Sequence, residues 1–190
     1  PITMTEGATV ARMAQQIKPL ADIFILNGFP VEGTAILKHE DRLVLIKRGE
    51  VPSSSELEML MASRHSPGIH RRLKKAVVGI AGCGGLGSTV AVALARVGIG
   101  TLIIADFDVV EPSNLNRQQY FIDQLGAPKV EALEKNLSRI NPSVVIRSHP
   151  VRLVPENISD IFAPADILVE AFDRADQKAM LVETVEMDLP

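Results

Sequence analysis

The chain has 190 residues, of which 46% are hydrophobic and 23% are charged, an ordinary composition for a soluble globular protein. This length allows one full domain and a second, small one. The net charge of −3 gives no global basic field and therefore no support for a nucleic-acid partner. The single cysteine, Cys83, excludes a disulfide or a cysteine-rich zinc site within these residues and fits a reducing compartment. No signal-peptide pattern opens the sequence, so we expect a cytoplasmic protein.

Residues 1–50 predict a small α+β unit. Apolar residues recur at helical spacing within residues 8–18, at Val10, Met13, Ala14 and Ile17. Residues 23–26 and 43–46 are short apolar runs typical of strands, and Asn27-Gly28 marks a turn after the first run.

Residues 51–75 predict a linker that contains one helix. Ser55 is placed to cap a helix running from Glu56 towards Arg64. Ser66-Pro67-Gly68 ends that helix, and the basic segment 70–75 then leads into an apolar strand.

Residues 76–190 alternate between strands and helices. The expected strands are short, continuous and rich in Val and Ile, as in a sheet that is covered on both faces. Such alternation predicts an α/β domain with a Rossmann-like, doubly wound and mostly parallel sheet. Such a domain usually has further strands, so we expect it to continue beyond Pro190. The expected strands are residues 76–81, 101–105, 144–148 and 166–170, and the expected helices are 86–97, 127–140, 156–162 and 175–185.

A membrane span is the alternative for residues 76–95, which carry no charge and have about the length that crosses a bilayer. Two features argue against it. The glycines gather in one short cluster, and the next apolar run resembles a strand that ends at Asp106.

Ligands of such a sheet bind beyond the carboxyl ends of its strands. The first strand is followed by a G-x-G-G-x-G turn and a helix, a combination that binds phosphate through backbone N–H groups. Asp106 follows the second strand about twenty residues beyond the glycines, where a ribose-binding acid is found. Asp173 follows the fourth strand, where it is either a ligand or a helix cap. The turn itself has a purely structural alternative as a tight strand-to-helix connection, and Cys83 within it is interpreted as a small packing residue.

Two basic residues suggest more than a dinucleotide site. Residues 111–119 form a long loop in which amide side chains surround Arg117. Lys129 falls in the first turn of the next helix, where a cation opposes the helix dipole by roughly 0.3–1 kcal/mol unless an anion lies nearby. Together, Arg117 and Lys129 are typical of groups that hold a polyphosphate.

Four segments carry a resemblance to a known family, namely "GIAGCGGLGSTVAVALARVG", "ADFDVVEPSNLNRQQY", "GAPKVEALEKNLSRINP" and "DILVEAFD". They closely resemble ThiF and MoeB, the bacterial relatives of ubiquitin-activating enzymes. The resemblance implies a nucleotidyltransferase that uses MgATP to adenylate the C-terminal glycine of a β-grasp sulfur carrier such as ThiS. It also implies a homodimer. The net charge and the clustered glycines favour neither a nucleic-acid partner nor a membrane partner.

The resemblance assigns roles to individual residues. Gly82, Gly84, Gly85 and Gly87 would form the nucleotide loop, and Asp106 would bind the ribose. Asn114, Arg117 and Lys129 would hold the triphosphate, and Asp173 would hold Mg²⁺. The family usually has Asp-Asn where this chain has Asp173-Arg174. Arg64 is our candidate for the arginine that the family supplies from the partner subunit, with Arg71 and Arg72 as alternatives.

The first unit resembles ThiS itself through "EGATVARMAQQI", "FILNGFPV" and "EDRLVLIKRGEV". It continues into Val51-Pro52 without a Gly-Gly tail, so it is interpreted as a retained carrier-like module and not as the adenylated substrate. This segment favours ThiF over MoeB and therefore thiamine biosynthesis.

Two other functions remain open. An NAD-dependent oxidoreductase would use the glycine turn and Asp106 but leaves Arg117 and Lys129 unexplained. A catalytically silent module that binds carrier proteins belongs to a different functional class.

Overall fold

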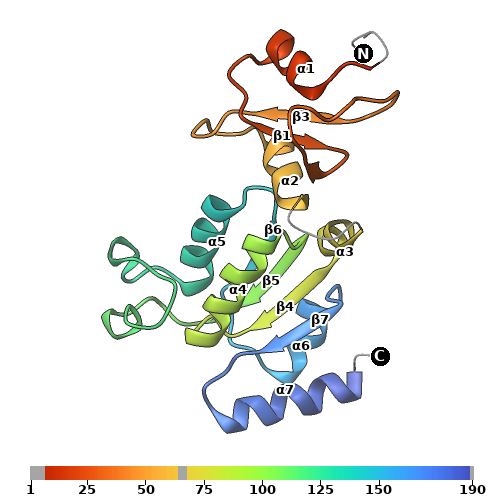
Figure 1. The fold of residues 1–190 in the computed structure, drawn as a ribbon. Helices are drawn as coiled ribbons and strands as arrows, with labels where there is room; N and C mark the ends of the chain where they lie inside the picture. Colours follow the sequence, from red (N-terminus) through yellow and green to blue (C-terminus); the bar gives the residue numbers. More distant parts are fainter. Residues whose placement is uncertain (1–6, 64–67, 189–190) are drawn as a thin grey trace. The chain divides into compact units, whose positions relative to one another are not determined.

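The computed structural model describes residues 7–63 and 68–188, and the chain forms two compact units, Pro1–His70 and Arg71–Pro190. In the first unit, three antiparallel strands in the order β2-β1-β3 accompany two helices (Figure 1). This is the small α+β unit that the sequence predicts. Its elements are α1 (Val10–Ile17), β1 (Ile23–Leu26), β2 (Phe29–Pro30), β3 (Leu43–Ile46) and α2 (Ser54–Ala62).

Local sequence explains the turn and the core of this unit. Asn27 and Gly28 have φ values of 53° and 89°, the left-handed conformation that a two-residue hairpin between β1 and β2 requires. Val10 and Ala14 of α1 and Ile25 of β1 are buried, whereas Ile17 at the end of α1 is 49% exposed. The helical face predicted from spacing is therefore buried only in its first two turns.

Two features of residues 51–75 differ from expectation. Helix α2 is capped by Ser53 and not by Ser55, because Glu56 completes a capping box with Ser53: each backbone N–H donates to the other residue's side chain. The basic segment is itself helical, as α3 (Ile69–Lys75), with its cations in the last turn where the helix dipole favours them. Arg64 lies outside the described residues.

The second unit contains a four-stranded parallel sheet in the order β6-β5-β4-β7. The chain starts at β4, extends to β5 and β6 on one side, and then crosses to β7 on the other. This arrangement places a topological switch point between β4 and β7, where doubly wound folds bind ligands. The strands are β4 (Val77–Ala81), β5 (Thr101–Ala105), β6 (Val145–His149) and β7 (Ile167–Glu170).

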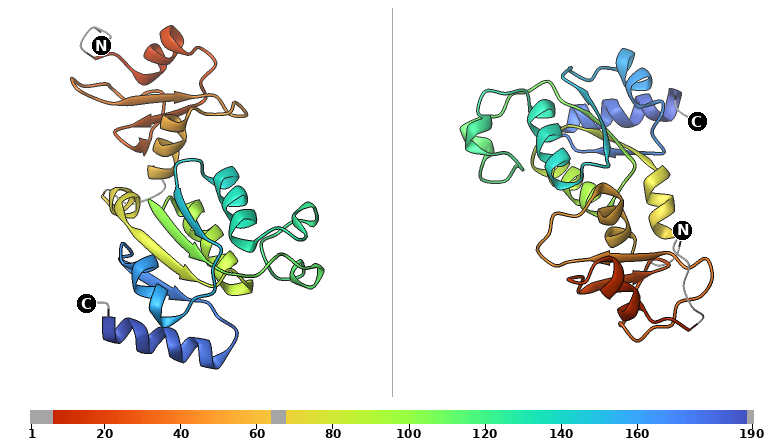
Figure 2. Two further views of the ribbon diagram at one scale, coloured as in Figure 1. Left: turned by 180° about the vertical axis from the view of Figure 1, so that it is seen from behind. Right: turned by 90° about the horizontal axis from the view of Figure 1, so that it is seen from above.

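Helices cover both faces of this sheet, as the sequence predicts. Ile80, Leu102 and Ile104 pack on the face covered by α4 (Gly85–Val97) and α5 (Lys129–Ile140). Ile103 packs on the opposite face, against α6 (Pro155–Phe162) and α7 (Ala175–Asp188). Figures 1 and 2 show the two pairs of helices on opposite sides of the sheet. Residues 76–95 divide between β4 and α4, and within the described residues no helix has the length and apolar character to cross a bilayer.

The long connection between β5 and α5 contains two short 3₁₀ helices, η1 (Pro112–Asn114) and η2 (Ile122–Gln124). Amide side chains hold it in place. Asn136 of α5 donates to the carbonyl of Gln119 at 2.9 Å, and the amide nitrogen of Gln124 donates to Asn136 at 2.8 Å. Part of the amide-rich sequence therefore serves to fix the loop that carries Arg117.

Candidate functional site

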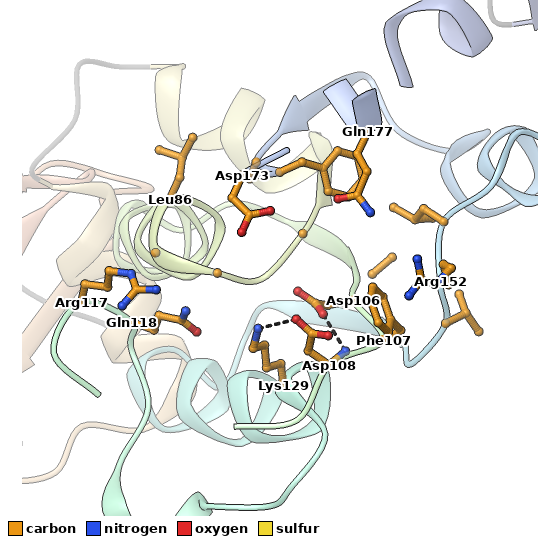
Figure 3. Close-up of a pocket in the computed structure, with 18 residues that line it drawn as sticks. Leu86, Asp106, Phe107, Asp108, Arg117, Gln118, Lys129, Arg152, Asp173 and Gln177 are labelled. Atoms are coloured by element: carbon orange, nitrogen blue, oxygen red, sulfur yellow. Dashed lines mark hydrogen bonds and ion pairs between the residues drawn. The ribbon is translucent and has the colours of Figure 1, made fainter. Parts of the chain in front are cut away.

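A pocket of about 210 Å³ lies beyond the carboxyl ends of β4, β5 and β7 (Figure 3). This is the edge at which parallel α/β sheets bind ligands. Most of the residues predicted for the site line it: Gly82, Gly84, Gly85, Asp106, Arg117, Lys129 and Asp173. Segments that are distant in the sequence therefore converge at one place.

The glycines after β4 have different functions. Gly84 and Gly85 line the pocket at the start of α4, and the nearest atom to a Cβ at Gly84 would be Nε2 of Gln118, 4.0 Å away. This opening leaves backbone N–H groups accessible to an anion. Gly87, in contrast, belongs to the packing between helix and strand, because a Cβ there would overlap the carbonyl oxygen of Gly82.

Asp106 joins the glycine turn to the end of β5. One carboxylate oxygen accepts the backbone N–H of Cys83 at 2.7 Å, and the other accepts that of Asp108 at 2.8 Å. Each carboxylate oxygen has a second acceptor position. The side chain can therefore bind a hydroxyl group from the pocket while it holds the turn in shape.

Lys129 is buried and paired. Its ammonium lies 2.8 Å from the carboxylate of Asp108, and its residue is 6% exposed at the first position of α5. The carboxylate compensates for the unfavourable position of the cation at the helix N-terminus. The side chain of Asp108 is 48% exposed. The sequence analysis gave Asp108 no role, although it follows Asp106 by two residues at the end of the same strand.

Arg117 reaches the same pocket from the long loop. Its guanidinium donates to the carbonyl of Ser113 and to the side chain of Asn116, both at 3.0 Å, and its Cγ would lie 3.7 Å from a Cβ at Gly85. The side chain is therefore held beside the glycine turn.

Asn114 does not line the pocket in the described part of the chain. It is buried, and its carboxamide oxygen accepts the backbone N–H of Glu111 at 2.9 Å. Its assignment to the triphosphate stays a prediction.

Asp173 lies exposed at the pocket after β7, and Figure 3 shows its carboxylate across the opening from Asp106 and Asp108. Its neighbour Arg174 forms an ion pair of 2.8 Å with Asp176. Across residues 7–63 and 68–188, no three His, Cys, Asp or Glu side chains gather as a metal site. A single carboxylate suits Mg²⁺, which is commonly held by one or two carboxylates together with substrate phosphates.

Phe107, Arg152 and Gln118 are among the other residues that line the pocket. The guanidinium of Arg152, which follows β6, lies 4.0 Å from the ring centroid of Phe107. Gln118 is 8% exposed and follows Arg117 directly. No local signal in the sequence marks Arg152, because its contact with Phe107 depends on how two distant loops fold.

Figure 3 shows an order along the pocket. Arg117 and Gln118 lie at one end, and Phe107 and Arg152 lie at the other. Asp106 lies between these two ends. The end with Arg117 and the glycine turn suits phosphates, the carboxylate of Asp106 suits ribose hydroxyls, and the end with the Phe107 ring suits a base.

Cys83 is a buried packing residue, as interpreted from the sequence. It is 0% exposed, and the hydroxyl of Tyr120 donates to its carbonyl at 2.7 Å. Burial, followed by the negative charge of Asp106, raises the pKa of the Cys83 thiol well above its ordinary value. The folded protein therefore keeps this thiol neutral, and it is not a candidate nucleophile.

We expect native Cys83 to resist iodoacetamide at pH 8 and to react at the rate of a free thiol once the protein is unfolded in urea. The raised pKa also has a consequence for stability: the unfolded chain loses this proton first, above about pH 8.5, so the free energy of unfolding falls as the pH rises further. The substitution Cys83→Ala should reduce that alkaline loss. Rapid alkylation of the native protein would contradict the assignment.

Sequence and structure comparisons relate the chain to known proteins. A sequence model of the ThiF family matches residues 58–187, and one of the ThiS-like ubiquitin family matches residues 1–49. The sulfur carrier protein adenylyltransferase of Thermus thermophilus is 42% identical over 103 residues, which cover 54% of this chain and 38% of that protein. The probable adenylyltransferase/sulfurtransferase MoeZ of Mycobacterium tuberculosis is 39% identical over 104 residues, which cover 54% of this chain and 26% of that protein.

Among solved structures, the tRNA N6-threonylcarbamoyladenosine dehydratase TcdA of E. coli in complex with ATP aligns with a TM-score of 0.66 and 27% identity. The alignment covers 73% of this chain and 58% of TcdA. The chain spans between 26% and 38% of the length of the two sequence relatives described above.

Proposed function

The chain belongs to the ThiF family, and from that premise we propose that its second unit binds ATP and adenylates the C-terminal glycine of a ThiS-like sulfur carrier. The observation that carries this proposal is that two cations line the same pocket as the open glycine turn: Arg117 lies beside Gly85, and Lys129 is paired with Asp108. A dinucleotide has no need of both cations, whereas a triphosphate does. The relatives named as adenylyltransferases and the ATP complex of TcdA support the same conclusion.

The order of side chains suggests how ATP lies. Its phosphates would contact Arg117, Lys129 and the N–H groups of the glycine turn, and its ribose would contact Asp106. The base would then lie against Phe107 and Arg152. Asp173 would hold a magnesium ion, which supplies further neutralisation of phosphate charge when it is bound.

The reaction needs positioning and charge neutralisation and no general base. A carboxylate is already ionised at neutral pH. One of its oxygens forms a bond to the α-phosphorus while the bond from that phosphorus to the bridging oxygen breaks, and pyrophosphate leaves with the electron pair. Two anions must therefore approach each other, which the cations and backbone N–H groups favour.

The ThiS-like match of residues 1–49 supports a carrier of the same kind as the substrate, in thiamine biosynthesis. We further propose a homodimer in the cytoplasm, in which a partner arginine reaches the phosphates. Arg71 and Arg72 of α3 are exposed, and the described pocket lining includes neither of them. Either could therefore serve the site of a second subunit, as could Arg64.

Mass spectrometry tests the proposed reaction. Full-length protein, MgATP and a ThiS-like carrier that ends in Gly-Gly should yield a carrier heavier by one AMP, and pyrophosphate exchange into ATP should depend on that carrier. A carrier without its last glycine is the matched control and should remain unmodified. Binding of NAD without exchange would support the oxidoreductase instead, and carrier binding without ATP turnover would support the silent module.

We expect Arg152→Ala to weaken ATP binding about fivefold and to leave the binding of inorganic triphosphate unchanged. A guanidinium that stacks on a base contributes about 1 kcal/mol to the binding free energy. Arg152 lies at the end of the pocket opposite Arg117, so its loss should not affect contacts with the phosphates. Calorimetric titration with both ligands measures the difference. The exposed Arg147 of β6 offers a control, Arg147→Ala. Equal losses for ATP and triphosphate would contradict the assignment of this end to the base.

A further inference from the structure

The end of the pocket that holds Phe107 and Arg152 carries one polar side chain to which the function proposed above gives no role. Gln177 lies in the first turn of α7, four residues after Asp173, and lines the same pocket. Figure 3 shows its carboxamide on the side of the opening that carries Phe107 and Arg152. The side chain is half-buried, and the hydrogen bonds among the described residues leave its carboxamide free to bind a ligand.

The side chains around Gln177 at this end supply no other hydrogen-bond acceptor within the described lining. Arg152 presents only N–H donors, and its guanidinium lies 4.0 Å from the ring centroid of Phe107. Val151 and Leu153, which flank Arg152 and also line the pocket, are aliphatic. A base that carries an exocyclic amino group therefore needs the oxygen of Gln177 as its side-chain acceptor.

The carboxylates that line the pocket are engaged elsewhere. Asp106 holds two backbone N–H groups and lies in the middle of the pocket, where the ribose is placed. Asp108 is paired with Lys129 at 2.8 Å, and Asp173 is assigned to magnesium. The other glutamine of the lining lies at the opposite end of the pocket (Figure 3). Gln177 is thus the acceptor that the described lining leaves for the base.

A carboxamide holds an acceptor and a donor side by side in one plane. Adenine presents the complementary pair, because its 6-amino donor lies next to a ring nitrogen that accepts, and glutamine pairs with adenine in this bidentate way. We propose that Gln177 recognises the adenine of ATP, with Oε1 accepting from the 6-amino group and Nε2 donating to the neighbouring ring nitrogen. This inference rests on the proposed function and names the residue that selects the base.

The 6-amino group is the part of the base that this contact reads. A carboxamide that turns by half a rotation exchanges its oxygen and nitrogen, so it can also pair with the 6-oxo group and N1–H of hypoxanthine. Purine riboside triphosphate is therefore the sharper analogue. It carries hydrogen in place of the amino group, keeps the ring, ribose and phosphates of ATP, and adds no bulk.

A double-mutant cycle with the full-length protein tests the contact by calorimetric titration, which needs no turnover. The unaltered protein should bind purine riboside triphosphate about fivefold more weakly than ATP, as for the loss of one hydrogen bond. The substitution Gln177→Leu should weaken ATP binding at least about fivefold. In that variant ATP and the analogue should bind within about twofold of each other, because the group that distinguishes them is gone.

The controls separate base recognition from general damage to the site. Inorganic triphosphate should bind Gln177→Leu as it binds the unaltered protein, and a lower affinity for it would overturn the inference. Gln16→Leu, at an exposed position of α1 in the first unit, should keep the preference for ATP over the analogue. Gln177→Ala repeats the test with a smaller side chain.

Other outcomes decide between the inference and its premise. A preference for ATP of the same size in Gln177→Leu and unaltered protein overturns the inference, since another group would then read the amino group. Equal affinity of the unaltered protein for ATP and the analogue also overturns it and needs no variant to fold. Both results leave the proposed adenylation standing if AMP is still transferred to the carrier. Failure of the unaltered protein to bind ATP would reject the proposed function and this inference together.

Discussion

The substitution Lys129→Met is expected to lower the rate of carrier adenylation by about 10²–10³, as for the loss of one preorganised charge donor. Methionine retains the apolar stem, so the packing of this 6% exposed residue at the start of α5 is preserved. Asp108 loses its partner, but its half-exposed carboxylate remains hydrated and the fold should persist. Carrier-dependent pyrophosphate exchange measures the effect.

A structural explanation of Lys129 must be separated from the functional one, because the ammonium also neutralises Asp108. The double variant Asp108→Asn with Lys129→Met removes both charges. It should remain as slow as Lys129→Met alone if the ammonium serves the phosphates, and it should regain activity if the ammonium only compensates the carboxylate. Lys135→Met, at an exposed position of the same helix, should retain normal turnover.

The sequence was sufficient to predict the parts of the site that follow from strand order and local turns. In a parallel sheet the segments after β4, β5 and β7 must meet at one edge, so the glycine turn, Asp106 and Asp173 could be placed together. The same reasoning extended to Lys129, because a cation at a helix N-terminus requires an anion nearby. The structure adds that Asp108 is one such anion.

Other parts of the site depend on long-range packing and could not be predicted from the sequence. Arg152 reaches Phe107 only because the connection after β6 returns to the loop after β5, and the burial of Gln118 depends on how a long loop lies against the glycine turn.

The N-cap of α2 was predicted wrongly for a local reason. Three consecutive serines compete for that position, and Ser53 and Ser55 both have a glutamate three positions later, Glu56 and Glu58, so local sequence does not choose between them. In the structure the capping box forms between Ser53 and Glu56.

The glycines that the family motif groups together are expected to separate into two classes when each is replaced by alanine. Gly87→Ala should destabilise the second unit by about 3 kcal/mol or more, because the new methyl group would overlap the backbone carbonyl of Gly82, which cannot move without displacing the turn. We expect a melting temperature lowered by several degrees, or no folded protein, with ATP binding lost as a result.

Gly84→Ala provides the matched comparison, because φ at this position is −74° and a Cβ would meet its nearest neighbour only at 4.0 Å. The variant should fold, with a loss of about 1 kcal/mol because alanine is a poorer N-cap than glycine, which is well below the loss expected for Gly87→Ala. Its methyl group would nevertheless stand where a phosphate must approach the backbone N–H groups, and ATP affinity should fall at least about tenfold. Thermal unfolding with and without ATP measures both quantities for both variants. A Gly84→Ala protein that binds ATP normally would place the phosphates elsewhere, whereas a stable Gly87→Ala protein would contradict the packing argument.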